Sequence, residues 1–143
     1  MNDKIYSTEN RTEILDENFD LTTAYTAVGK LICTKGLSNV ALWLRGAKNE
    51  SDVIRFRAVS YATQEDAEAG ANPHYAQIQT VGSAIVGLEP EEFETDKANI
   101  ELVTPLGYSS LVPYIQIEMR VVTDGATPAN IARASVSFDR RYS

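Results

Sequence analysis

The feature that most constrains the fold is an uninterrupted alternation of apolar and polar side chains at residues 114–121. The apolar members are Ile115, Ile117, Met119 and Val121, and the polar members between them are Gln116, Glu118 and Arg120. Successive side chains of a strand point to opposite faces of a sheet, whereas a helix would scatter these residues around its whole surface. The run therefore predicts a β-strand with one buried face, and the rest of the chain must supply a sheet and a cover for it.

Two further segments alternate in the same way, and weaker candidates lie between them. In 53–58, Ile54, Phe56 and Ala58 are expected to point inward, with Arg55 and Arg57 outward. Residues 134–138 repeat the pattern near the C-terminal end. The weaker candidates, each bordered by Gly, Pro, Asn or Asp, are 26–34, 40–45, 75–81, 83–86 and 100–103. Together they predict about eight strands.

Composition and turn residues narrow the fold class. Val, Ile, Thr and the aromatic residues, which favour strands, supply almost a third of the 143 residues. Asn-Gly is absent and Asp-Gly occurs once, so tight hairpins are expected to be scarce. We therefore predict a single all-β domain, a jelly-roll or Greek-key β-sandwich whose strands cross between sheets. One helical turn is expected at 63–70, capped by Thr63 and ended by Gly70.

The first part of the chain is predicted to be an N-terminal arm, residues 1–20, preceding a β-sandwich domain at 21–143. Residues 1–20 hold six acids against two bases, with Ile5, Tyr6, Ile14 and Leu15 as their apolar contacts. We expect this arm to lie over the body of the protein or over a neighbouring subunit. The chain begins without a basic segment followed by an apolar run, so a soluble, unexported protein is expected.

Charge and residue inventory disfavour several function classes. The net charge of −7 has the wrong sign for binding nucleic acid or an anionic membrane through Lys and Arg. A single cysteine, Cys33, and a single histidine, His74, exclude an internal disulfide and a Cys/His metal cluster, and they make a catalytic triad a poor interpretation. We expect Cys33 to be a buried small hydrophobe. The sequence thus predicts no enzyme activity and no cofactor.

Acidic residues concentrate in the run from Glu89 to Asp96, which has five acids in eight residues. Oxygen ligands this close together can bind Ca²⁺, but the spacing is not that of an EF-hand loop. A solvated loop or a short edge strand is the preferred interpretation. Glu101 and Glu118 lie inside predicted strands, where alternation points them away from the apolar face, so they are expected to be surface charges.

Two groups of residues are candidates for binding. Trp43 alternates with Leu42 and Leu44, which suggests a strand covered on both sides and places Trp43 in the core or in an interface. In the alternative function, a carbohydrate-binding module, the sugar-stacking residues would be Trp43, Tyr61, Tyr75 and Tyr108. The chain ends in Arg140, Arg141 and Tyr142, a basic group that complements the acidic arm and suggests head-to-tail contact between identical subunits.

The C-terminal third resembles the closing strands of small jelly-roll virion proteins of tailed bacteriophages, the head-decoration (cement) and related structural subunits. The residues concerned are 98–103, the Pro-Tyr-hydrophobic strand within 112–121, the Gly/Ala/Thr/Pro loop 123–129, and the final alternating strand 132–138. The resemblance implies a homo-oligomer in the virion, assembled in the host cytoplasm, that binds the major capsid or other virion proteins without catalytic residues.

Overall fold

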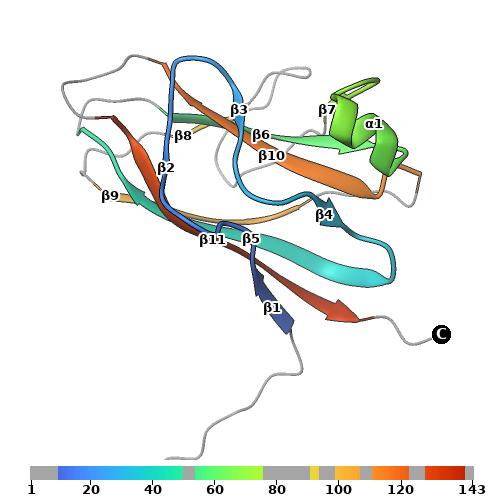
Figure 1. Cartoon of the computed structure of the whole chain (residues 1–143). Coiled ribbons are helices and arrows are strands. Elements are labelled where there is room, and N and C mark those ends of the chain that lie inside the picture. Colours follow the sequence, from blue (N-terminus) through green and yellow to red (C-terminus); the bar gives the residue numbers. More distant parts are fainter. Residues whose placement is uncertain are drawn as a thin grey trace, which may run out of the picture.

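The fold is an all-β sandwich of two antiparallel sheets, as predicted, with one short helix outside them (Figure 1). The computed structural model describes residues 10–49, 54–75, 91–93, 99–106, 111–122 and 128–140. The predicted strand at 83–86, most of the one at 75–81 and the loop 123–127 lie outside these residues.

The two sheets differ in size. The five-stranded sheet has the order β1 (Asn10–Glu13), β11 (Asn130–Arg140), β5 (Leu37–Ala47) and β9 (Asn99–Pro105), with β2 (Phe19–Asp20) also paired to β11. The six-stranded sheet has the order β3 (Thr26–Ala27), β10 (Tyr114–Val121), β6 (Ile54–Tyr61) and β7 (His74–Tyr75), with β4 (Ile32–Cys33) paired to β10 and β8 (Glu91–Phe93) paired to β6.

The chain crosses repeatedly from one sheet to the other. Strands β5, β9 and β11 lie in the five-stranded sheet, whereas β6 and β10, which follow β5 and β9 in the chain, lie in the six-stranded sheet. Within the described residues, β6 and β7 are the only consecutive strands that pair, and α1 (Gln64–Ala69) separates them. This arrangement agrees with the scarcity of tight hairpin signals in the sequence.

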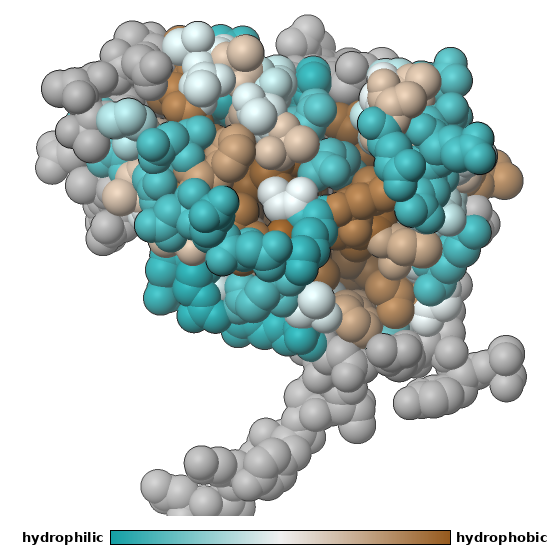
Figure 2. Space-filling view, in the orientation of Figure 1, coloured by the Kyte–Doolittle hydropathy of each residue, from teal (hydrophilic) through white to brown (hydrophobic). Residues whose placement is uncertain are grey.

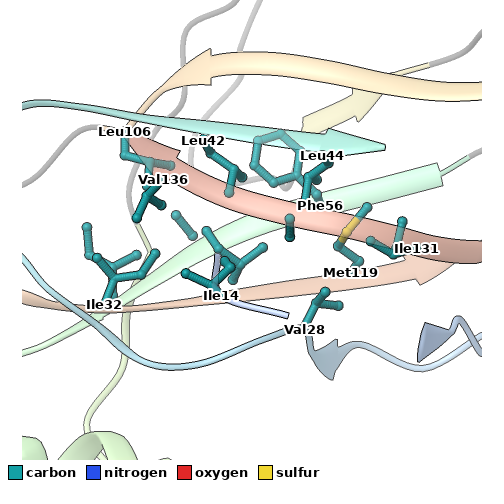
Figure 3. Close-up of a cluster of buried hydrophobic side chains, with 14 of the residues drawn as sticks. Ile14, Val28, Ile32, Leu42, Leu44, Phe56, Leu106, Met119, Ile131 and Val136 are labelled. Carbon is teal, nitrogen blue, oxygen red and sulfur yellow. The ribbon is translucent and has the colours of Figure 1, made fainter. Parts of the chain in front are cut away.

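The core lies between the sheets and is filled by the alternating residues of the long strands (Figure 3). All four apolar residues of the 114–121 run are fully buried, and so are Ile54 and Phe56 of β6. From the five-stranded sheet, Leu42, Leu44 and Val136 face them. Each large side chain buried in this way stabilises the fold by about 1.5–3 kcal/mol. Figure 2 shows hydrophobic residues in the middle of the visible face, with hydrophilic residues on both sides of them.

The segment predicted as an N-terminal arm is paired with the five-stranded sheet from residue 10 onward. Strand β1 pairs with β11 over four residues, and β2 pairs with its other end. Ile14 is only 4% exposed, and its backbone N–H donates to the Ala134 carbonyl at 2.8 Å. Residues 10–13 and 19–20 therefore belong to the five-stranded sheet, and Ile14 between these strands contributes to the core. Residues 1–9 lie outside the described part of the chain.

Two local predictions have opposite outcomes. The helical turn is confirmed: the Thr63 side chain accepts a hydrogen bond from the Asp66 N–H, and Gly70 ends α1 in the left-handed conformation at φ 64°. The burial of Cys33 is wrong, since its side chain is exposed. Strand β4 has only two residues, and alternation that turns Ile32 into the core turns Cys33 outward.

Candidate interaction surface

Trp43 lies on the outer face of the five-stranded sheet. Its neighbours in β5, Leu42 and Leu44, are 1% and 0% exposed, so alternation directs the indole away from the core. Trp43 itself is partly exposed. The sequence analysis placed Trp43 in the core or in an interface. The prediction of the core is therefore wrong, and the prediction of an interface stays a prediction.

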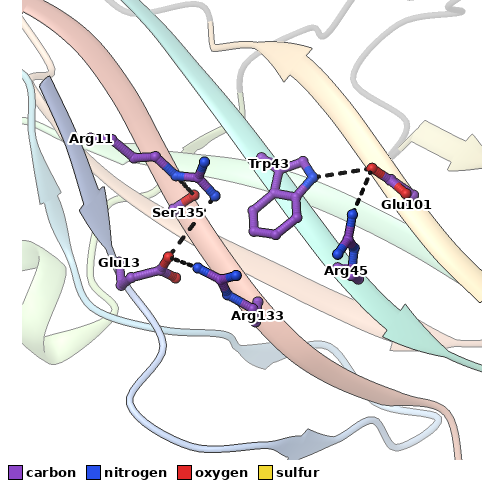
Figure 4. Close-up of polar contacts among 7 residues, drawn as sticks. All are labelled: Arg11, Glu13, Trp43, Arg45, Glu101, Arg133 and Ser135. Carbon is purple, nitrogen blue, oxygen red and sulfur yellow. Dashed lines mark hydrogen bonds and ion pairs between the residues drawn. The ribbon is translucent and has the colours of Figure 1, made fainter. Parts of the chain in front are cut away.

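Three arginines from three strands surround the indole ring (Figure 4). The guanidinium carbons of Arg11, Arg45 and Arg133 lie 4.6, 4.9 and 5.1 Å from the ring centroid. The strand register brings them together, because β11 pairs with both β1 and β5 and places Ser135 opposite Trp43. Cation–π contacts at exposed sites contribute about 0.5–1 kcal/mol each, so the ring and the arginines fix one another's positions.

Two carboxylates complete the cluster (Figure 4). Glu13 accepts from Arg133 at 2.5 Å and lies 4.0 Å from Arg11, whose Nε donates to the Ser135 hydroxyl at 3.0 Å. On the other side, Glu101 accepts from the indole Nε1–H and from Arg45, both at 3.4 Å. Polar groups of four strands are thereby linked across the sheet.

These side chains form an exposed surface, here named the Trp43 patch: Arg11, Glu13, Trp43, Arg45, Glu101, Val103 and Arg133. Val103 lies opposite Trp43 on β9 and is 70% exposed. The three arginine side chains are each 54% exposed. A patch that combines Trp, Arg and an exposed apolar residue has the composition of protein-binding hot spots.

An open hollow of about 460 Å³ adjoins the Trp43 patch. It is lined by Arg45, Gly46, Ala47, Ile100, Glu101, Asn130 and Ala132. The register of β11 against β5 shifts between Ile131 and Arg133, next to the pair formed by Ile131 and Gly46. A Cβ added at Gly46 would lie 2.0 Å from the Asn130 carbonyl oxygen, so only glycine fits there.

A second cluster of aromatic and arginine residues lies on the outer face of the six-stranded sheet. The Tyr25 ring has Arg57 at 3.9 Å and Arg120 at 5.7 Å from its centroid, and Arg57 pairs with Glu118 at 2.7 Å. The buried Tyr25 hydroxyl has no hydrogen-bond partner among the described residues. Burial raises the pKa of the Tyr25 phenol above 10.0, and Arg57, Arg55 and Arg120 partly oppose that shift.

Several of the predicted sugar-stacking and interface residues are buried, and others lie outside the part of the chain that the structure describes. Tyr61 is only 4% exposed, so its ring offers almost no surface on which a sugar could stack. Ile14 is in the core and Leu15 packs against it, so Ile14 offers no surface to a partner. The predictions outside the described residues or side chains are those for Ile5, Tyr6, Tyr75, Tyr108, Arg140, Arg141 and Tyr142.

The structure describes the side chains of some of the acidic residues that the sequence analysis considered. Glu101 and Glu118 are on the outer faces, as alternation predicted. Residues 91–93 form the short strand β8, which pairs with β6. The prediction that the run from Glu89 to Asp96 could bind Ca²⁺ depends on side chains that the structure does not describe, so it stays a prediction. Among the described residues, no group of three His, Cys, Asp or Glu side chains is placed to hold a metal ion. In the described part of the chain, no helix is long and apolar enough to cross a membrane, since α1 has only six residues.

Sequence reasoning missed the partners of both aromatic rings. Arg133 and Ser135 alternate with Ala134 and Val136, a signal that already placed them outward. Nothing in the local sequence pattern indicated Arg11, whose partner Ser135 is 124 residues away.

Comparisons with known protein families, with curated proteins and with solved structures find no match to this chain.

Proposed function

We propose that this protein is a non-enzymatic structural subunit of a phage virion, of the head-decoration (cement) or a related assembly type, that acts through protein–protein contacts. The observation that carries the proposal is the Trp43 patch, a partly exposed indole held among three arginines and next to the exposed Val103. Trp and Arg dominate binding energy at protein interfaces. Fixing these side chains before binding lowers the entropy that is lost in the complex.

The strand order supports the virion class. The order β1-β11-β5-β9 packed on β3-β10-β6-β7 follows the alternation expected for a jelly roll. Jelly rolls form viral capsid and lectin domains. The three segments that resemble phage virion proteins coincide largely with β9, β10 and β11, which are the last strands of both sheets. The partners we propose are the major capsid protein or other virion proteins, and further copies of this chain.

Co-sedimentation with intact particles tests the proposal. The purified protein should pellet with particles of its phage through a sucrose cushion, and Trp43→Ala should lower the bound fraction at least tenfold, the loss typical of a hot-spot residue. Gln64→Ala on the exposed side of α1 is the matched control and should bind like the wild type. A wild-type protein that stays in the supernatant with every particle fraction would contradict the virion role.

A second candidate, a carbohydrate-binding module, is favoured by the hollow beside Trp43. Arg45, Glu101 and Asn130 line it, and planar polar side chains of this kind hydrogen-bond sugar hydroxyls. The guanidiniums around the indole weigh against it, because sugar stacking requires a free ring face. A glycan array decides the matter: binding that is lost in Trp43→Ala supports this function, and an array without binding removes it.

A further inference from the structure

We infer that the Trp43 patch binds the acidic run of a second copy of this chain, residues 89–96. The inference rests on the proposed function, since both require the patch to be a protein-binding surface. It goes further by naming the partner segment and the chemistry that would recognise it. Three properties support it: the surplus of donors in the patch, the composition of the run, and the separation of the two surfaces within one subunit.

The patch has more hydrogen-bond donors than acceptors. Arg11, Arg45 and Arg133 each carry five N–H groups, whereas the cluster contains only two carboxylates, Glu13 and Glu101. Most guanidinium N–H groups have no acceptor among the described residues, and the three side chains are half exposed. A planar guanidinium binds a carboxylate through two parallel hydrogen bonds. The patch is therefore suited to a partner that brings several carboxylates.

The acidic run has the complementary composition. Its sequence, Glu-Pro-Glu-Glu-Phe-Glu-Thr-Asp, brings five carboxylates together within eight residues, against the three arginines of the patch. Strand β8 places Phe93 opposite Ile54 of β6, so the carboxylates of the run, and not Phe93, are what we propose the patch binds. Opposite charges at the rim raise the association rate and fix the orientation of the partners.

The topology requires that this contact be made between subunits. Strand β8, which contains Glu91, Glu92 and Phe93, pairs with β6 in the six-stranded sheet. The Trp43 patch lies on the outer face of the other sheet, with the core between the two layers. A β8 held beside β6 cannot reach the patch of its own chain. Contact between two different surfaces on successive copies builds rings or longer assemblies when it repeats.

Trp43 is the only tryptophan in the chain, so its fluorescence reports on the patch directly. The full-length protein should be titrated with a synthetic peptide of residues 88–97 and with the same peptide in which every acid is replaced by its amide. The acidic peptide should change the Trp43 emission saturably, and the amide peptide should bind at least tenfold more weakly. Arg133→Gln should weaken binding of the acidic peptide severalfold, whereas Arg120→Gln on the opposite face should leave it unchanged.

A charge exchange in the full chain provides the second measurement. Arg133→Glu should abolish self-association in sedimentation velocity runs, and Glu92→Lys together with Glu94→Lys on the partner copy should restore it, since Glu92 lies opposite Arg55 on the outward side of β6. No fluorescence response to the acidic peptide, or an equal response to the amide peptide, would overturn the inference. An equal response to inorganic phosphate or single-stranded DNA would also overturn it, by revealing a general anion site. Co-sedimentation with particles that persists after such a failure would leave the proposed function standing.

Discussion

On each outer face of the sandwich an aromatic ring lies among arginines, but the two clusters differ in their exposure to water. Around Trp43, the paired side chains of Arg133 and Glu13 are 54% and 44% exposed. Around Tyr25, those of Arg57 and Glu118 are 25% and 20% exposed. The residue types are nearly the same, so the difference in exposure must decide whether each cluster contributes to stability or to binding.

Depth changes the strength of an ion pair. An exposed pair contributes about 0–1 kcal/mol to stability, because water screens it and ordering the side chains costs entropy. A more buried pair is harder to break, because removing one partner leaves the other charge desolvated. We therefore interpret the Tyr25 cluster as a clamp that joins β6, β10 and the segment before β3. The Trp43 patch contributes less to folding and is available for binding.

Gly46→Ala should have the largest effect and should act on the five-stranded sheet. The added Cβ would lie 2.0 Å from the Asn130 carbonyl oxygen and 3.0 Å from the Ile131 Cα, so β5 and β11 must move apart. We expect the free energy of unfolding to fall by about 3 kcal/mol or more, as for overpacking at a rigid site. Urea denaturation followed by circular dichroism measures the loss, and a shifted Trp43 emission in the folded state would locate it.

Gly36→Ala is the matched control for this substitution. Gly36 also lies beside β5 and has a φ of 72°, but a Cβ added there would meet no atom within 4 Å beyond its neighbours in the chain. Only the cost of the left-handed conformation applies, about 1 kcal/mol. Equal losses for both variants would show that close approach of the strands at Gly46 does not matter.

Glu118→Gln and Glu101→Gln compare the two clusters directly. Glu118 accepts a hydrogen bond from Arg57 Nε at 2.7 Å, and the same oxygen forms an ion pair with a terminal guanidinium nitrogen, also at 2.7 Å. Its replacement should lower the free energy of unfolding by about 1–2 kcal/mol, discounted from the cost of a fully buried pair. Glu101→Gln should lower it by less than about 0.5 kcal/mol. If thermal unfolding shows equal losses, the proposed division between a clamp and a binding surface is wrong.

The long strands were predictable because their information is local. Alternation within 114–121 determines which residues of β10 are buried, and the same holds for Ile54 and Phe56 of β6. The segment 26–34 was predicted as one strand but forms two, β3 and β4, both paired to β10. Gly29 separates them with a φ of 80°, and a Cβ there would lie 2.6 Å from the Ile14 carbonyl oxygen. The break thus depends on a contact with a distant segment.

The candidate site was predictable only in part, for the same reason. Alternation indicated that Trp43 and its flanking leucines point to opposite faces, but it could not show which partners would reach the indole. Arg11 and Glu13 arrive through pairing of β1 with β11, and Arg133 through the register of β11 against β5. Register depends on which strands become neighbours, which a single sequence does not state. The acidity of residues 1–20 also concealed that Ile14 completes the core.

Tyr25→Phe tests the clamp through its hydroxyl. The Tyr25 oxygen is buried and has no hydrogen-bond partner among the described residues, so its removal should raise the free energy of unfolding by about 0.5–1 kcal/mol at pH 7. Because the folded-state pKa of Tyr25 is raised above 10.0, the wild type should lose stability as the pH rises above that value. The phenylalanine variant lacks this loss, so its advantage should grow between about pH 9 and pH 11. An advantage that shrinks over this range would contradict burial as the cause of the shift.

Arg45→Gln should have the smallest effect on folding and sharpens the interpretation of the exposed face. Arg45 lies 4.9 Å from the Trp43 centroid and 3.4 Å from Glu101, with its side chain 54% exposed. Its loss should change the free energy of unfolding by less than about 0.5 kcal/mol, since screened contacts contribute little. The Trp43 emission should nevertheless shift, because a charge next to the indole has gone. A loss above about 1 kcal/mol, the upper range for exposed pairs, would mean that the Trp43 patch also serves as a structural clamp. Its exposure would then no longer distinguish it from the Tyr25 cluster.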